Sequence, residues 1–275
     1  MGHNVLDILD ELGPRVAEAR HRLIFLDLDG SFEPSNSAEL DTFTWERLKQ
    51  LLGSLAQRAN VSIAAMSGQD RGELQARLGV PGVTYIGNHG LEISGPGQIF
   101  IEPAATAKST EIKELAELLT SRLHDFPDVV VEEKGLSVSI HTGQVPAEQA
   151  EQVRRTVHAI LASSDHPFHL TTRENIFEIR PRVYWNKGDA VNWVKEQTGH
   201  PEALVLYIDD NRSGENPTES IKDAIVLKVG AHCESTPEFE IEGPPQVIDF
   251  LSWLDKFLET QEQGLTDERQ RYSLV

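Results

Sequence analysis

The sequence predicts an α/β protein: a mainly parallel sheet with a smaller α+β unit inserted into it. Three observations support this fold class. Short apolar runs alternate with helical patterns in the first and last parts of the 275-residue chain, which implies a parallel sheet covered by helices on both faces. Acidic or hydroxyl side chains directly follow three of these runs. The middle of the chain combines two helical patterns with two candidate hairpins, typical of an antiparallel sheet with helices.

Five short runs rich in apolar and β-branched residues are expected as strands of the parallel sheet. They are residues 23–26, 61–66, 83–86, 204–208 and 225–229. Apolar residues at helical spacing predict the helices that alternate with these strands. These are 43–55 (with Phe43, Leu48, Leu51, Leu52 and Leu55 on one side), a helix from after Gly68 to Leu78, 187–198 and 245–258.

The two ends of the chain carry different patterns. Within residues 1–20, Val5, Ile8, Leu9 and Leu12 are spaced for one helical face. The segment from about residue 260 to 275 is polar, and we expect it to be frayed.

The middle segment predicts a separate α+β unit at residues 104–183, inserted into a core formed by residues 1–103 and 184–275. Helices are expected at 110–126 and 147–162. Strands are expected at 129–131 and 136–141, with a turn at Lys134-Gly135, and at 168–171 and 176–180.

The composition limits the functions that the chain can have. Its formal net charge is −19 and its pI is near 4.9, whereas nucleic-acid phosphates and anionic membranes bind clustered Lys and Arg. We therefore expect neither a nucleic-acid nor a membrane partner. The sequence contains no run of about 18 apolar residues that could span a bilayer. Its single cysteine, Cys233, favours a reducing compartment, which we expect to be the cytoplasm.

The richest chemical signal is the run Leu23–Leu26 followed by Asp27-Leu28-Asp29-Gly30-Ser31. It places two carboxylates at the carboxyl end of a strand, where open α/β sheets bind their ligands. Two acids held side by side in a partly buried place repel each other and favour a bound cation. One of them could also act as a nucleophile.

Two later positions repeat this strand-end placement, and a third polar residue stands at the start of a helix. Ser67-Gly68 follows one predicted strand, Lys187 begins a predicted helix, and Asp209-Asp210 follows another strand. Each has an ordinary alternative: a helix-capping serine, a solvated lysine or a pair of turn aspartates. Together they supply an anion site, a cation and metal ligands, so they favour phosphoryl transfer.

In this order the motifs resemble the haloacid dehalogenase-like (HAD) phosphatases, which have Asp-x-Asp-Gly-Thr/Ser, a strand-end Ser or Thr, a Lys and an acidic pair. Three further segments resemble the trehalose-6-phosphate phosphatase family of that superfamily. They are Gly87-Asn88-His89-Gly90-Leu91-Glu92, Glu132-x-Lys134-Gly135 followed by His141, and Phe177-Glu178-Ile179-Arg180-Pro181 leading to Asn186-Lys187-Gly188. The resemblance covers about residues 22–258.

The resemblance implies a Rossmann-like HAD core with an inserted α+β cap domain of the C2 type. It also implies a Mg²⁺-dependent phosphomonoesterase. This hydrolase would convert trehalose 6-phosphate to trehalose and phosphate through an aspartyl-phosphate intermediate, a step of trehalose biosynthesis. The expected partner is a small-molecule sugar phosphate, and the expected cofactor is Mg²⁺.

The resemblance further implies roles for single residues. Asp27 would attack phosphorus, and Asp29 would act as general acid and then as general base. Ser67 and Lys187 would complete the catalytic set by holding the phosphoryl oxygens. The metal would be held by Asp27, Asp29 (through its backbone carbonyl), Asp209 and Asp210. The substrate would be bound by Glu132, Lys134, His141, Glu178, Gly68 and Asn186.

Three positions depart from the family pattern. Ser213 stands at the second acidic position of the last motif, where Glu215 could supply the carboxylate; Thr142-Gly143 replaces Tyr-Arg; and Glu33 replaces a small apolar residue. Two alternatives therefore stay open. One is a phosphatase of another osmolyte phosphate, such as glucosyl- or mannosyl-glycerate or glycerol phosphate. The other is a sugar-phosphate-binding family member without turnover. The cap motifs disfavour a mutase.

Overall fold

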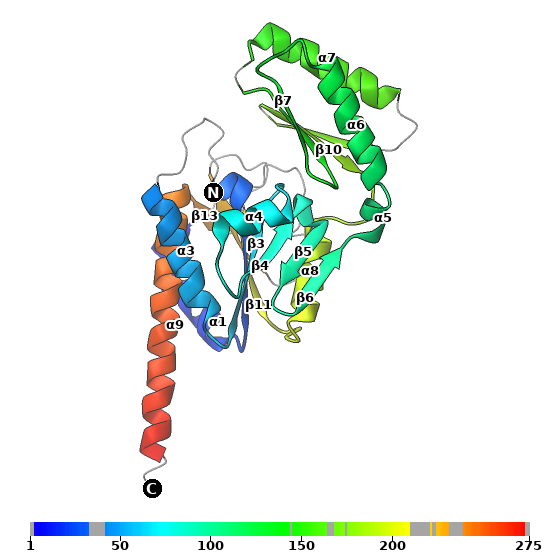
Figure 1. Cartoon of the computed structure of the whole chain (residues 1–275). Helices are drawn as coiled ribbons and strands as arrows, with labels where there is room; N and C mark the ends of the chain where they lie inside the picture. Colours follow the sequence, from blue (N-terminus) through cyan, green and yellow to red (C-terminus); the bar gives the residue numbers. More distant parts are fainter. Residues whose placement is uncertain are drawn as a thin grey trace.

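The computed structural model describes residues 3–32, 42–143, 145–163, 168–173, 175–209, 221, 224–230 and 239–272. Figure 1 shows a larger α/β body, a smaller α+β unit above one end of its sheet, and a long C-terminal helix that runs past the body.

Nine strands in these described ranges form one sheet in the order β1-β13-β12-β11-β2-β3-β4-β5-β6. Neighbours from β1 to β4 are parallel, and β4, β5 and β6 pair antiparallel. The α/β class is therefore confirmed, while the β5–β6 hairpin is an addition that the apolar runs did not indicate. The strands are β1 (His3–Asn4), β2 (Arg22–Asp27), β3 (Val61–Met66), β4 (Thr84–Gly87), β5 (Glu92–Gly95), β6 (Gln98–Ile101), β11 (Leu204–Asp209), β12 (Ile225–Val229) and β13 (Phe239–Ile241).

Alternating side chains of β2 divide the core into two layers, as a strand buried on both faces requires. Ile24 and Leu26 pack into a cluster on one face, and Leu23 and Phe25 into a cluster on the other. The first face is covered by α1 (Leu9–Glu18), α3 (Thr42–Ala56), α4 (Arg71–Leu78) and α9 (Pro244–Tyr272), and the second by α8 (Lys187–Gln197). Shorter helices are η1 (Val5–Ile8), α2 (Leu28–Ser31), η2 (Asn88–Gly90) and α5 (Pro103–Thr106).

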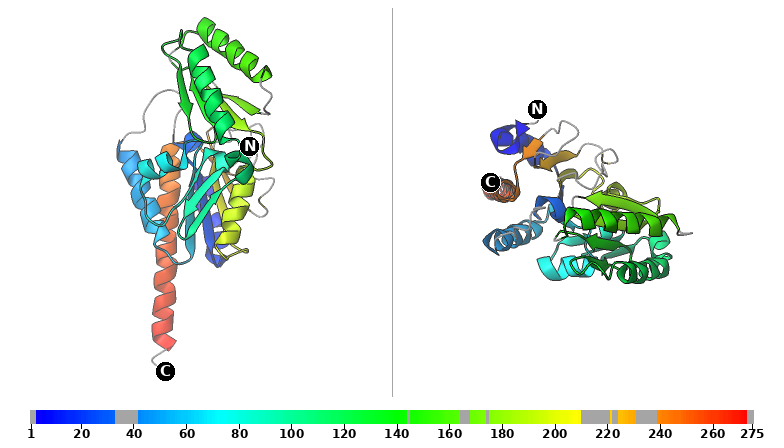
Figure 2. Two further views of the ribbon diagram at one scale, coloured as in Figure 1. Left: turned by 45° about the vertical axis from the view of Figure 1, so that its right-hand side comes forward. Right: turned by 90° about the horizontal axis from the view of Figure 1, so that it is seen from above.

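The middle of the chain is α+β, as its patterns predict. Four strands in its described part form an antiparallel sheet in the order β7-β8-β10-β9, and α6 and α7 pack on it through buried Ile112, Val157 and Ile179. Figure 2 shows this unit over the side of the body that carries α8, away from α9. The elements are α6 (Ser109–Arg122), β7 (Val130–Glu133), β8 (Val138–His141), α7 (Ala147–Ala162), β9 (Phe168–Arg173) and β10 (Ile176–Pro181).

The C-terminal helix is longer than its apolar pattern predicts. The buried apolar side chains of α9 reach Leu258, yet the helix continues to Tyr272. Arg58, just after α3, pairs with Asp255 at 2.7 Å and with Glu262 at 2.6 Å. The pair with Glu262 continues the contact with the body beyond Leu258. The expectation of a frayed segment from about residue 260 is wrong for the backbone up to residue 272.

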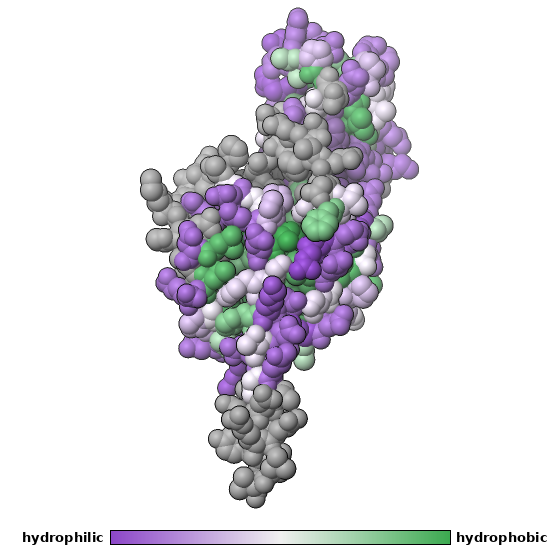
Figure 3. Space-filling model, turned by 90° about the vertical axis from the view of Figure 1, so that its left-hand side faces the viewer, coloured by the Kyte–Doolittle hydropathy of each residue, from purple (hydrophilic) through white to green (hydrophobic). Residues whose placement is uncertain are grey.

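The molecular surface in Figure 3 is mostly hydrophilic, with apolar side chains in separate patches. Phe43, expected to face inward, is 80% exposed. It lies five residues before Leu48, which places it about 140° around α3 from the buried side. Within the described ranges, we find no helix with the length and apolar character needed to cross a bilayer.

Candidate active site

Four predicted site residues lie at neighbouring element ends, on the sheet edge that faces the α+β unit (Figure 1). β2 ends at Asp27, β11 ends at Asp209, Ser67 directly follows β3, and Lys187 begins α8. Parallel register places these ends together, because β2 pairs with β3 on one side and with β11 on the other. All four side chains are buried, at most 2% exposed. The sequence therefore predicted which residues converge here.

Lys187 and Asp27 form a buried ion pair in which Lys187 Nζ donates to Asp27 Oδ2. Burial is the main cause that raises the pKa of Asp27; nearby Asp209 and Asp29 add to it, and Lys187 opposes it. Burial would lower the pKa of Lys187, but Asp27, Asp209 and Asp29 outweigh it and raise that pKa. Three carboxylates thus surround one ammonium group, an excess of negative charge that favours a further cation.

The carboxylate of Asp29 lies in a cradle of hydrogen-bond donors. It accepts from Ser67 Oγ through Oδ1 and from the backbone N–H of Gly68 through Oδ2. A Cβ atom on residue 68 would lie 2.5 Å from His89 Nε2 and 3.0 Å from Asp29 Oδ2, so glycine permits this close approach. The same hydroxyl and backbone N–H are also suitable donors to a phosphoryl oxygen.

The α+β unit reaches this cradle through β10 and the turn between β7 and β8. Lys134 Nζ donates to Gly68 O at 2.9 Å and to Glu178 Oε1 at 3.3 Å. Glu178 Oε1 also lies 2.6 Å from His89 Nε2. Lys134 and Glu178, predicted from the middle segment, are therefore brought to the loop that carries Ser67 and Gly68.

Asn88 and His89 form the side of the body that receives this contact. Their φ values are 47° and 56°, a left-handed conformation that is costly for residues other than glycine. Asn88 Nδ2 donates to Lys134 O at 3.0 Å, and Asn88 Oδ1 accepts from Ser137 Oγ at 2.5 Å. The sequence displayed these two residues in the Gly87–Glu92 motif, but their contacts to the α+β unit were not predicted.

Within the described part of the chain, the remaining predicted site residues make no hydrogen bond or ion pair to the Asp27–Lys187 pair or to the Ser67–Gly68 cradle. His141 Nε2 lies 2.9 Å from Glu132 Oε2, and both side chains are partly exposed. The hydrogen bond to His141 lowers the pKa of Glu132, and Lys134 adds to this. Asn186 caps α8, accepting from Gly188 N at 2.7 Å. Asp210, Ser213, Glu215, Glu33 and Cys233 lie outside the described residues.

Comparison with known proteins places this site in a family. A model of the trehalose-phosphatase family matches residues 25–240, which is most of the chain. The chain belongs to the trehalose-phosphatase family. The family predicted from the sequence motifs is thereby confirmed.

Members of the trehalose-phosphatase family also appear among the individual matches. The trehalose-phosphate phosphatase of Mycobacterium tuberculosis H37Rv is 29% identical over 253 residues, covering 87% of this chain and 63% of that protein. The chain therefore spans less than two thirds of the length of this relative.

Solved structures support the fold. A trehalose-6-phosphate phosphatase related protein has a TM-score of 0.72 at 23% identity, covering 87% of this chain and 99% of the other. Trehalose-6-phosphate phosphatase from Aspergillus fumigatus has a TM-score of 0.58 at 22% identity, covering 93% and 99%. The α/β fold expected from the sequence is confirmed.

Proposed function

We propose that this chain is a Mg²⁺-dependent phosphatase that hydrolyses trehalose 6-phosphate to trehalose and phosphate. The observation that carries the proposal is the buried Asp27–Lys187 pair beside Asp209 and the Ser67–Gly68 cradle. Nucleophile, cation and anion donors meet at the carboxyl edge of one sheet, where α/β proteins place their ligands. Membership of the trehalose-phosphatase family supports the choice of substrate.

In the proposed reaction, Asp27 attacks phosphorus while Asp29 gives a proton to the departing sugar oxygen. Asp29, now ionised, takes a proton from a water that attacks the aspartyl-phosphate; the phosphorus–Asp27 bond breaks and phosphate leaves. Ser67, Gly68 N–H and Lys187 hold the phosphoryl oxygens and stabilise their charge in the transition state. Because Asp29 now occupies the Ser67–Gly68 donors, it must turn away when the phosphoryl group binds.

The donor set fits Mg²⁺, a hard cation that keeps several waters and needs few protein ligands. Asp27 and Asp209 offer buried carboxylate oxygens, and we propose that the Asp29 backbone carbonyl and Asp210 complete the set. A three-residue cluster of His, Cys, Asp or Glu is not preformed within the described ranges, in keeping with a largely hydrated ion. When bound, Mg²⁺ would neutralise negative charge on the phosphoryl group.

We propose residues 104–183 as the cap and residues 1–103 and 184–275 as the core. The Lys134–Gly68 and Glu178–His89 contacts support a cap that closes over the site and excludes water. Lys134, Glu178, Glu132 and His141 would face the sugar, since carboxylates and ammonium groups give directed hydrogen bonds to hydroxyls. The single cysteine supports a reducing compartment, and a cytoplasmic location stays a prediction.

Phosphate release from a panel of sugar phosphates, with Mg²⁺ and with EDTA, tests the function. We expect phosphate release to depend on the metal, and we expect kcat/KM to be highest for trehalose 6-phosphate. Asp27→Asn should lose turnover and keep the fold, checked by circular dichroism. A near-normal rate in Asp27→Asn would refute the mechanism.

The second candidate is another osmolyte phosphate, favoured by Thr142-Gly143 in place of the family's Tyr-Arg. Thr142 is buried and its N–H donates to Asn175 O at 2.8 Å. Because glycine follows it in place of arginine, this segment cannot make a bidentate arginine contact. A higher kcat/KM on glucosyl- or mannosyl-glycerate phosphate would select this candidate. Binding of sugar phosphates without any turnover would select the non-catalytic alternative.

A further inference from the structure

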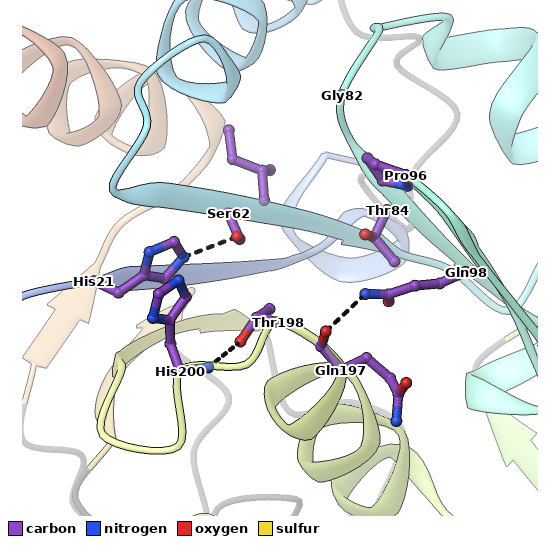
Figure 4. A pocket seen from close by; sticks show the side chains of 10 residues that line it. His21, Ser62, Gly82, Thr84, Pro96, Gln98, Gln197, Thr198 and His200 are labelled. Carbon is purple, nitrogen blue, oxygen red and sulfur yellow. Dashed lines mark hydrogen bonds between the residues drawn. The ribbon is translucent and has the colours of Figure 1, made fainter.

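A pocket lies at the opposite edge of the main sheet from the candidate active site. It has a volume of about 250 Å³ and opens between the amino ends of β2, β3 and β4, the β5–β6 turn and the end of α8 (Figure 4). Seven polar residues line it: His21, Ser62, Thr84, Gln98, Gln197, Thr198 and His200. Because β2 and β3 each have six residues, the two sites are roughly 20 Å apart along the strands.

Hydroxyls, amides and imidazoles supply the hydrogen-bonding groups of this pocket. His21 Nε2 lies 2.9 Å from Ser62 Oγ, and Gln98 Nε2 donates to Gln197 O at 3.1 Å. The other amide atom, Gln98 Oε1, is buried and has no hydrogen-bond partner among the residues that the structure describes. An unpaired buried acceptor is unfavourable, so a donor group entering here would be stabilised.

The two histidines form one side of the pocket. Their rings stack with centroids 4.0 Å apart and planes 15° apart, and Figure 4 shows them across from Thr84 and Gln98. Parallel rings do not converge their nitrogen atoms on one point, so this pair is a poor metal chelator. Burial, with the nearby His200 and Arg22, lowers the pKa of His21, so its ring is neutral at neutral pH.

Charged groups contribute little to this surface. Among the described residues that line the pocket, none is Asp, Glu, Lys or Arg. Arg22 is adjacent in sequence to His21, but its guanidinium donates to Val16 O at 2.6 Å and to Ala17 O at 3.2 Å. A phosphate or carboxylate ligand would thus find no dedicated cation here.

We propose that this pocket binds a small, neutral, hydroxyl-rich molecule of monosaccharide size. Hydroxyls of such a ligand both donate and accept, which matches the mixed hydroxyl, amide and imidazole lining. The volume lies below the roughly 300–1,000 Å³ of pockets for drug-sized ligands, so the occupant is small. The site does not depend on the reaction proposed above, because it shares no residue with the candidate active site.

Site-resolved NMR tests the proposal. The uniformly ¹⁵N-labelled full chain is titrated separately with D-glucose, trehalose and inorganic phosphate. We expect D-glucose to shift the NMR signals of the Gln98 side-chain amide and of the Thr198 backbone amide, and we expect these shifts to saturate. Gln98→Met, which keeps the side-chain length and removes the amide, should weaken D-glucose binding at least tenfold. Inorganic phosphate should leave the backbone amide signal of Thr198 unchanged and should shift that of Gly68.

Glu178→Gln is the matched control, because it alters the candidate sugar side of the active site and leaves the pocket untouched. Its D-glucose response at Thr198 should equal that of the unmodified chain. The proposal is overturned if phosphate alone shifts the pocket, if D-glucose shifts only the Gly68 region, or if Gln98→Met binds D-glucose normally. The proposal is also overturned if the Thr198 amide signal does not shift with D-glucose at up to about 100-fold excess over protein.

Discussion

Asp29 shows at the scale of one residue how the donors of the site are satisfied. Its carboxylate accepts from Ser67 Oγ and Gly68 N–H, the groups assigned in our proposal to the phosphoryl oxygens. A carboxylate and a phosphoryl group are both anionic acceptors, so they compete for the same charge-assisted hydrogen bonds. Nearby Asp27 and Lys187 form their own ion pair, which holds the carboxylate that we propose as the nucleophile.

Replacing Asp29 should separate binding from catalysis. Asp29→Asn removes the competing charge and the proton donor, so inorganic phosphate should bind about tenfold more tightly, a gain of about 1.4 kcal/mol. Turnover should fall by roughly 10²–10⁴-fold. Isothermal titration calorimetry and phosphate-release assays measure the two effects. Unchanged phosphate affinity in Asp29→Asn would show that the carboxylate does not compete.

Metal removal should destabilise the protein, because Asp27, Asp29 and Asp209 share one lysine. Mg²⁺ at 100 times its Kd should add about 2.7 kcal/mol to the free energy of unfolding, and EDTA should remove it. Asp209→Asn should lose most of this gain. Asp70→Asn is the control, since Asp70 caps α4 and asparagine caps equally well. Equal Mg²⁺-dependent rises in Tm for both variants would contradict the metal assignment.

The pairing of α3 with α9 shows how ion pairs extend an element past the core. Asp255 accepts from Ser54 Oγ at 2.9 Å and from Arg58 Nη2 at 2.7 Å in a partly buried place. Glu262 accepts from Arg58 Nη1 at 2.6 Å, but its side chain is 45% exposed. Exposed ion pairs contribute little to stability, whereas partly buried multiple hydrogen bonds contribute more.

These two acids give a matched pair of variants. Asp255→Ala should lower the free energy of unfolding by about 1–3 kcal/mol, because it removes the acceptor of Ser54 Oγ and the partly buried carboxylate partner of Arg58. Glu262→Ala should cost less than about 1 kcal/mol. Urea unfolding followed by circular dichroism measures both. Equal losses in the two variants would mean that burial does not decide the contribution.

Over the whole molecule, the α+β unit contacts the body through a small set of polar residues and one small apolar cluster that includes Leu91 and Leu136. Lys134, Glu178 and Asn88 join the two parts around the Gly68 loop, and His89 lies within 2.6 Å of Glu178. Large apolar clusters stay within each part. Polar contacts of this kind can open and re-form, which is compatible with the cap role that we propose for this unit.

Weakening this contact should affect large substrates more than small ones. Glu178→Gln removes the charge that bridges Lys134 and His89, so KM for trehalose 6-phosphate should rise at least tenfold. Hydrolysis of p-nitrophenyl phosphate, which lacks the sugar, should change less than twofold. Steady-state kinetics on both substrates gives the comparison. An equal loss on both would place Glu178 in the chemistry rather than in sugar binding.

The sequence by itself determined the α/β class, the α+β middle segment, and the meeting of Asp27, Ser67, Lys187 and Asp209. These follow from apolar periodicity and from the rule that parallel strands end at one edge, both of which are local or topological. Only the tertiary structure decided where the Asp29 carboxylate turns, how His89 and Asn88 meet the α+β unit, and how far α9 extends. Those features depend on contacts between residues far apart in the chain, such as Arg58 with Glu262, and short sequence patterns carry no record of them.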